Sequence, residues 1–161
     1  MTAKINVLVI ITEHFSTFKD ESTQKYSKVD FCVMLVLPAT LSIIVSLSGY
    51  HIRDDYIGAL ISAFAIFSGL LFNVLVLIYS ITGSDGEKDD MLVRLVRQTF
   101  ANISFAIMSC LLAVVLLTVL FFIDGSIQLM IEPIIYFVGM NFMLTMLMVL
   151  KRMHVLMRGC E

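Results

Sequence analysis

Charged residues are scarce in this chain, and their scarcity excludes an ordinary soluble domain. Only 15% of the 161 residues are charged and 59% are hydrophobic, whereas soluble domains carry about 25% charged residues. The mean hydropathy is +0.95. So few charges cannot cover a soluble fold of this size, and a net charge of −2 gives no indication of nucleic-acid binding. The composition therefore predicts a membrane protein with room for one domain and short tails.

Cysteines are also few. The chain has an odd number of cysteines, namely Cys32, Cys110 and Cys160. Two of them lie in apolar runs, and no pair has the spacing of metal ligands. We therefore expect no disulfide framework. Two of the cysteines are interpreted as small packing residues and the third as an exposed thiol in the tail.

Sequence motifs of enzymes are missing as well. The chain contains no nucleophile elbow, zinc-protease signature, P-loop or glycine-rich nucleotide motif. His14 and His154 are isolated along the sequence, and the spacing of His51, Asp54 and Asp55 matches no strong metal motif. No ionisable residue lies deep within an apolar run, although such residues usually mark pumps and transporters. We predict a non-enzyme with no catalytic residue, no metal and no cofactor.

What the chain does contain is four long apolar runs, at about 31–48, 57–81, 101–123 and 129–150. About 20 apolar residues cross a hydrocarbon core of ~30 Å as a helix, and a helix satisfies every backbone group of a single segment in lipid. We therefore predict an all-α integral membrane fold with four transmembrane helices. Its parts are a cytoplasmic or interfacial N-terminal segment (1–28), a four-helix membrane domain (29–150) and a cytoplasmic tail (151–161).

Positive charge predicts the orientation of these helices. Ten of the 11 Lys and Arg residues flank the runs on one side, and only Arg53 lies on the other. Because Lys and Arg are enriched in cytoplasmic segments, we predict that both termini and the loop between the second and third spans are cytoplasmic. The two outer loops are short, so soluble partners should bind on the cytoplasmic side.

Small and polar residues recur at steps of three or four along the second span and again along the third. They are Gly58, Ser62, Ala65, Gly69 and Asn73 in the second span, and Asn102, Ala106 and Ser109 in the third. In lipid, small residues permit close approach of helices, and polar side chains hydrogen-bond between them. These residues are predicted to pack either within one four-helix bundle or between copies in a homo-oligomer. The strongest form of the second alternative is a pore lined by Ser62 and Asn73.

The two prolines predict local features of the first and last spans. Pro38, near the middle of the first span, removes a backbone donor and predicts a kink. Glu132 and Pro133 are expected in the first turn of the fourth span. Proline is favoured there, and an acid meets the positive end of the helix dipole. We therefore interpret Glu132 as a capping residue.

Three cytoplasmic pieces remain. Apolar residues in 1–28 fall near one helical face, which predicts a short interfacial helix, with a partly disordered arm as the alternative. The apolar run there is at the lower limit for a signal peptide and lacks a cleavage site, so we expect mature protein. The third helix is expected to start in the cytosol around Asp89.

The candidate residues for docking a cytosolic partner share positive charge or flexible apolar side chains at the cytoplasmic helix ends. They are Arg94, Arg97, Lys151, Arg152, Met153 and Met157. Methionine is unbranched and polarizable, so it suits adaptable contacts. The alternative for the tail is a helix end whose basic groups reach lipid head groups.

Three segments carry a resemblance to known proteins. They are DDYIGALISAFAIFSGLLFNVLVLIYSITGSD, DDMLVRLVRQTFANISFAIMSCLLAVVLLTVLFFI and the tail KRMHVLMRGCE. In organisation, residues 30–155 resemble small four-span inner-membrane proteins of prokaryotic antiphage defence. These include the membrane subunit of the Kiwa system, RexB-type phage-exclusion proteins and four-span effectors of nucleotide-signalling defence.

The resemblance implies an oligomer in the bacterial inner (plasma) membrane. In the Kiwa-like case the protein would anchor or sense at the membrane and recruit a cytosolic effector on infection. In the RexB-like case it would form a pore and depolarise the cell. The expected partners are the lipid bilayer, further copies of the chain and a cytosolic protein, with no direct nucleic acid. A small transporter is less favoured, because no internal repeat is present.

Overall fold

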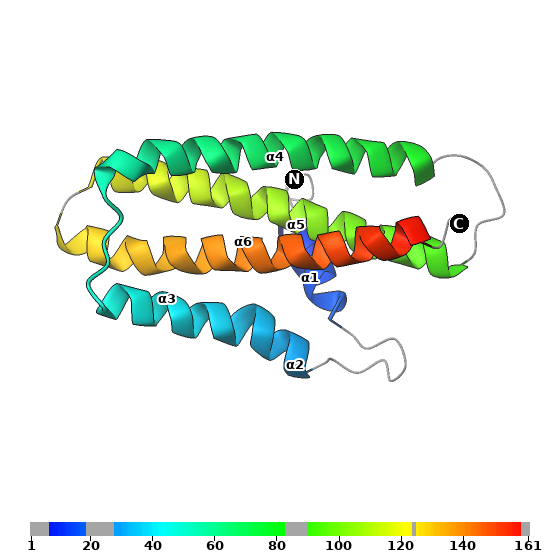
Figure 1. Cartoon of the computed structure of the whole chain (residues 1–161), viewed down its shortest axis with the longest axis horizontal. Helices are drawn as coiled ribbons and strands as arrows, with labels where there is room; N and C mark the ends of the chain where they lie inside the picture. Colours follow the sequence, from blue (N-terminus) through cyan, green and yellow to red (C-terminus); the bar gives the residue numbers. More distant parts are fainter. Residues whose placement is uncertain (1–6, 19–27, 83–89, 124, 159–161) are drawn as a thin grey trace, which may run out of the picture.

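The computed structural model describes residues 7–18, 28–82, 90–123 and 125–158, and every element in these ranges is a helix. The long helical rods lie side by side along the long axis of the molecule (Figure 1), and the short helix near the start of the chain lies against the rod formed by residues 90–121. The elements in chain order are α1 (Val7–Ser16), α2 (Lys28–Phe31), the π-helix η2 (Cys32–Val36), α3 (Leu37–Leu47), α4 (Asp54–Thr82), α5 (Asp90–Phe121) and α6 (Ser126–Arg158). The prediction of an all-α fold is confirmed for these residues.

Three helices are long and apolar enough to cross a membrane. They are Asp54–Ser80, Val93–Phe121 and Ile127–His154. They correspond to the second, third and fourth predicted spans. The start of α5 at Asp90 also agrees with a third helix that begins near residue 89. The first predicted span is a shorter apolar helix, Cys32–Leu47, which continues from α2.

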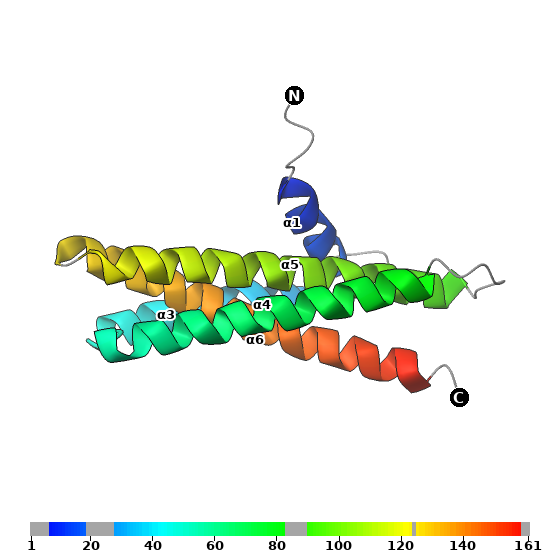
Figure 2. The ribbon, with the colours of Figure 1, turned by 90° about the horizontal axis from the view of Figure 1, so that it is seen from above.

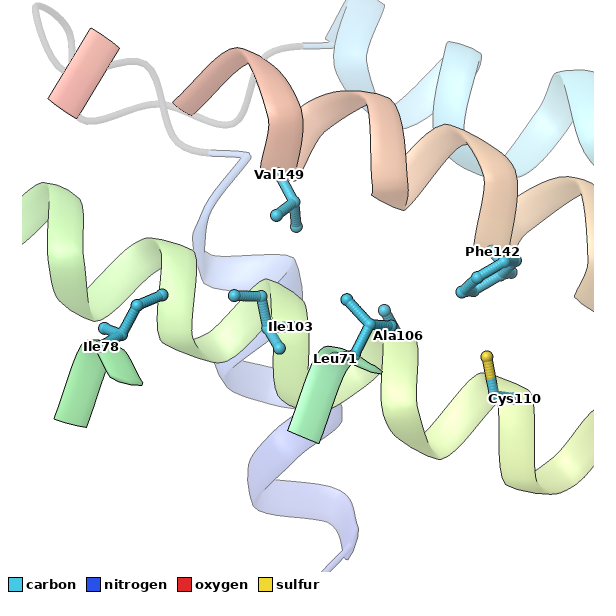
Figure 3. Packing of buried hydrophobic residues seen from close by; sticks show 7 residues of the cluster. All are labelled: Leu71, Ile78, Ile103, Ala106, Cys110, Phe142 and Val149. Atoms are coloured by element: carbon cyan, nitrogen blue, oxygen red, sulfur yellow. The ribbon is translucent and has the colours of Figure 1, made fainter. Parts of the chain in front are cut away.

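The core lies between α4, α5 and α6. α4 packs along α5, α5 packs on α6, and α3 packs on α6. Seven buried side chains from the three long helices point toward one another (Figure 3); they are Leu71, Ile78, Ile103, Ala106, Cys110, Phe142 and Val149. A second buried cluster, which includes Ile57, Leu117 and Ile135, lies toward the end of the bundle with the short α3–α4 and α5–α6 connections. α5 is therefore the central helix, and α4 is at the edge.

A π-helical stretch, Cys32–Val36, lies just before Pro38 in the first predicted span. Pro38 has no N–H, so the carbonyl of Met34 loses its helical partner. Asn141 of α6 supplies a replacement, because its Nδ2 donates to the Met34 carbonyl at 2.8 Å. The π-helical turn lies directly before Pro38, where the N–H of Leu37 donates to the carbonyl of Cys32. α6 therefore completes the hydrogen bonding of a helix that proline interrupts.

The capping interpretation of Glu132 is wrong. α6 begins at Ser126, so Glu132 and Pro133 lie inside the helix and not in its first turn. The chain reverses at Gly125, whose φ is +81°. Glycine adopts this left-handed conformation without a steric penalty, so α6 begins before the point where the apolar run does.

An apolar groove of about 480 Å³ lies between α3, α4 and α6. Leu41, Phe64 and Met143 are among its lining residues, one from each helix. Such a lining suits lipid chains or an apolar side chain and does not suit a polar ligand.

Candidate functional site

A buried polar contact anchors α1 to the bundle. His14 is 2% exposed, and its Nδ1 lies 2.8 Å from Oδ1 of Asn102 in α5. Because an amide oxygen can only accept, the Nδ1–H donates. The imidazole also stacks on Phe105, with the ring centroids 3.9 Å apart. Figure 2 shows α1 standing across α5, so the helical alternative for the N-terminal segment is confirmed over Val7–Ser16.

Burial changes the acid–base behaviour of His14. Its pKa is lowered from 6.5 to about 4, chiefly because the charged imidazolium loses its hydration. The hydrogen bond to Asn102 raises the pKa, and the positive charge of Arg152 lowers it further. The imidazole of docked α1 is therefore neutral at pH 7.

The end of α1 is held by both α5 and α6. The Thr17 hydroxyl donates to the His14 carbonyl at 2.6 Å and lies 3.1 Å from Oδ1 of Asn102. Arg152 of α6 donates from Nη2 to the Thr17 carbonyl at 3.1 Å. α1 is therefore a bridge between the start of α5 and the end of α6.

The structure separates the six predicted docking residues. Arg94, Arg97 and Lys151 are exposed, and Arg152 is half-buried against α1. Met153 is half-buried and packs against the central core. The side chain of Met157 lies outside the described residues. Arg152 and Met153 therefore serve contacts within the chain, whereas the three exposed cations remain accessible to a partner.

A polar pocket of about 290 Å³ lies between α1 and α5. Its lining residues are Glu13, Ser16, Thr17, Arg94, Arg97, Gln98 and Ala101. The four residues from α5 are spaced i, i+3, i+4 and i+7 and therefore share one helical face. Among the described residues, neither arginine forms a salt bridge. The pocket is thus lined by two guanidinium groups that no described carboxylate neutralises at contact distance.

The small and polar stripe of the second predicted span faces away from the bundle. Its five residues, Gly58, Ser62, Ala65, Gly69 and Asn73, are all exposed. A side-chain carbon added to either glycine would meet no described atom within 4 Å, and Asn73 makes no hydrogen bond in the described part of the chain. The buried residues of α4, such as Leu71 and Ile78, lie on the opposite face. These five residues therefore do not pack within the described bundle.

The stripe of the third span behaves differently. Asn102 and Ala106 are fully buried, and Ser109 is 5% exposed. Ala106 belongs to the core between α4 and α6, and Asn102 contacts α1. Here the alternative of packing within one chain is the one that the structure adopts.

A second buried polar cluster lies at the opposite end of the bundle. Glu132 is fully buried and accepts hydrogen bonds from His51 Nδ1 at 2.8 Å, the Ile52 N–H at 3.1 Å and Gln128 Nε2 at 3.0 Å. This carboxyl group therefore ties the connection between α3 and α4 to α6. The pairing joins residues 81 positions apart, so no local spacing in the sequence indicated it.

The two acids in the first turn of α4 stay outside this cluster. Asp54 and Asp55 are exposed, and Asp55 pairs with Arg53 at 2.9 Å. The described residues contain no group of three His, Cys, Asp or Glu side chains that could hold a metal ion. The cluster around Glu132 connects the residues between α3 and α4 to α6.

Comparisons of the chain with protein-family models, with curated proteins and with solved structures found no match.

Proposed function

We propose that this chain is a four-span membrane protein that self-associates through α4 and offers a docking surface for a cytosolic protein at the ends of α5 and α6. The observation that carries the proposal is the outward orientation of the α4 stripe. Lipid acyl chains gain no closer packing from the missing side chain of Gly69, and they offer the Asn73 amide no hydrogen-bond partner. A second helix supplies both, and small residues allow it to approach closely.

The spacing of the two buried polar clusters supports four crossings. Along α6, Glu132 belongs to one cluster and Arg152 to the other. At 1.5 Å per residue they are about 30 Å apart, which is the thickness of a hydrocarbon core. The continuous helical segment 28–47 is also about 30 Å long by the same rise, and it lies beside α6 (Figure 1). A polar cluster at each membrane surface agrees with four helices that cross between them.

Charge supports the orientation. The basic residues on one side are Lys4, Lys19, Lys25, Lys28, Lys88, Arg94, Arg97, Lys151, Arg152 and Arg158, and Arg53 lies at the other end. By the positive-inside rule the α1 end of the bundle is cytoplasmic. α1 exposes Val7, Leu8 and Val9, an apolar surface that suits a helix lying in the membrane interface.

Self-association can be tested with a matched pair of substitutions. Ala65 and Ala63 are both exposed on α4, but at 100° per residue they point in nearly opposite directions. Ala65→Leu should weaken the oligomer at least about tenfold in dissociation constant, and Asn73→Leu should weaken it too. Ala63→Leu, with the same added volume, should leave the constant unchanged. Crosslinking and mass measurement in lipid nanodiscs provide the readout, and an equal effect of both alanine substitutions would contradict the α4 interface.

The docking surface is proposed to consist of the exposed cations Arg94, Arg97 and Lys151 and the tail that follows His154. α5 and α6 continue past their contacts with α1, at 90–93 and 153–158, by about 6–9 Å at 1.5 Å per residue. Deletion after His154 keeps the contacts of Arg152 and Met153, so the bundle should still fold. Because the deletion removes the proposed docking tail, it should abolish co-purification of a cytosolic partner encoded beside this chain. Asn73→Leu should leave co-purification intact. Partner capture that survives the deletion would argue against the tail.

The biological setting that we propose is defence against phage, based on the four-span organisation. In this role the oligomer holds a cytosolic effector at the inner membrane until infection. Expression of the chain together with its neighbouring genes should lower the plating efficiency of at least one phage, and deletion after His154 should restore plating. Unchanged plating of a broad phage panel would contradict this role.

A pore is the second candidate, and the exposure of Ser62 and Asn73 favours it. If several copies placed their α4 stripes around an axis, these neutral polar groups would line a water-filled path. Purified protein in planar bilayers should then conduct ions, and Asn73→Leu should change the conductance. An oligomer that forms without conductance under infection-like stimuli would leave the docking function as the better account.

A further inference from the structure

We propose that the pocket between α1 and α5 binds a phosphate group. The proposal extends the proposed function, because it takes the α1 end of the bundle to be cytoplasmic. Its geometric basis is a cavity of about 290 Å³ with two arginines on its wall. Arg94 and Arg97 are three residues apart, so their stems emerge from neighbouring positions on one face of α5. A planar guanidinium offers paired donors that match the oxygens of a phosphate.

The donors available in the pocket can be counted from its hydrogen bonds. The Ser16 hydroxyl donates to the Glu13 carbonyl at 2.6 Å, and the Thr17 hydroxyl donates to the His14 carbonyl at 2.6 Å. Both hydroxyl protons are therefore already used. The groups left to donate are the guanidiniums of the two arginines and the amide of Gln98, all from α5. An anion accepts hydrogen bonds from these three groups and brings no positive charge that would repel the two arginines.

Size and position narrow the ligand further. Sites for drug-sized molecules enclose about 300–1,000 Å³, so this pocket suits a head group or a small phosphate ester. Glu13 on the opposite wall can accept a hydrogen bond, which favours a phosphate that carries a hydroxyl or ammonium group beside it. The pocket adjoins α1 at the proposed membrane surface. Basic pockets between helices on the cytoplasmic side are typical binding sites for lipid head groups.

The same chemistry could come from a membrane phosphodiester or from a soluble phosphate ester, and the test has an arm for each. The full chain is held in a maltoside detergent, which contains no phosphate, and phosphatidylglycerol is then titrated in. A second series uses soluble glycerol 3-phosphate and inorganic phosphate. Bound ligand is counted by native mass spectrometry. Saturable binding in the first series assigns the site to lipid, and saturable binding in the second assigns it to a soluble phosphate.

The matched variants are Arg94→Gln with Arg97→Gln, and Lys151→Gln. All three cations are exposed, so neither variant removes a core contact, and Lys151→Gln lowers positive charge at the same end without touching the pocket. We expect the double variant to lose at least about tenfold in affinity and the lysine variant to bind as the natural chain does. An equal loss of affinity in both variants, or unchanged affinity in the double variant, would contradict phosphate binding in this pocket.

Failure of this site can be told apart from failure of the proposed function. The oligomeric state is measured on the same samples, with Ala65→Leu as the variant that weakens self-association. Ala65→Leu should keep phosphate binding, because it lies outside the pocket. If the oligomer forms and no ligand in either series binds, the phosphate site is wrong and the α4 interface stands.

Discussion

At the residue scale, a few buried polar groups connect segments that are far apart in the sequence. His14 and Asn102 join α1 to α5, Glu132 joins the α3–α4 connection to α6, and Asn141 joins α6 to η2. A polar group that loses water without gaining a partner is costly in an apolar medium. Each of these contacts therefore fixes which segments lie together, beyond what apolar packing alone specifies.

Asn141 and Pro38 should be energetically coupled, because the amide replaces the donor that proline lacks. Asn141→Leu should lower the free energy of unfolding by about 1–3 kcal/mol, since the Met34 carbonyl is left unsatisfied. In a Pro38→Ala background the new N–H can donate to that carbonyl, and Asn141→Leu should then cost at least about 1 kcal/mol less. Denaturant unfolding in detergent micelles, followed by helicity, measures both values.

Thr145 provides the control for this cycle. Its hydroxyl is buried in α6 and donates within the helix to the Asn141 carbonyl, so it takes no part in the hydrogen bond to the Met34 carbonyl. Thr145→Val should therefore cost the same in both backgrounds. If Asn141→Leu also costs the same in both, Asn141 does not serve the carbonyl that proline frees.

At the element scale, α1 and α4 differ in how they depend on partners. α1 has 10 residues, and isolated helices shorter than about 12–15 residues are marginal in water. α1 therefore depends on its contacts with the bundle, such as those of His14 and Thr17, to remain helical. α4 has 29 residues, and a helix in lipid satisfies its own backbone groups, so the proposed self-association can use its outward face without loss of the helix.

Docking of α1 should weaken in acid. The pKa of His14 is about 4 when docked and 6.5 when free, so the docked state binds fewer protons between these values. The docking free energy is constant above pH 6.5, declines as the pH falls from 6.5 toward 4, and levels off below 4. At pH 5 the loss is about 2 kcal/mol. Amide exchange of 7–16, corrected for the intrinsic effect of pH, should show protection lost on acidification.

His14→Phe is the control for this pH dependence, because it keeps an aromatic ring against Phe105 and cannot titrate. It gives up the hydrogen bond to Asn102, so its amide protection at pH 7.5 should be lower than that of the natural chain. The protection of the variant should be the same at pH 5 as at pH 7.5. A variant that still loses protection in acid would show that another group is responsible. Arg152, which faces His14 from α6, stays charged throughout this range.

At the scale of the whole molecule, the two ends of the bundle differ. One end carries the short connections and the Glu132 cluster, and the other carries α1, the start of α5 and the end of α6. The proposed docking surface lies at the second end, because the first offers only the short connections. The proposed self-association uses the α4 face along the side of the bundle, so the two proposed interactions occupy separate surfaces.

Both termini are expected on the cytoplasmic side. Alkaline phosphatase fused after Arg53 should be active, because it reaches the periplasm, whereas fusions after Gly86 and after Glu161 should be inactive. The reason is the concentration of positive charge at the α1 end. A cytoplasmic reporter at the same three positions should show the opposite pattern and serves as the control. An active phosphatase at the C-terminus would mean an odd number of crossings or the reverse orientation.

The sequence by itself determined the helices, because lipid leaves a backbone few alternatives. Apolar length predicted the three long helices, the acidic residues near 89 marked the start of α5, and Pro38 marked the irregular turn. These features depend on neighbouring residues, so local patterns report them. The earlier start of α6 was missed, because a glycine turn, and not hydropathy, sets that boundary.

Only the tertiary structure decided which side chains meet. The stripes on α4 and α5 look alike in sequence, yet one faces outward and the other is buried. The rotation of each helix about its axis depends on packing with all of its neighbours, which no single segment encodes. For the same reason His14, isolated in the sequence, proved to be the anchor of α1, and Glu132 proved to be a buried acceptor.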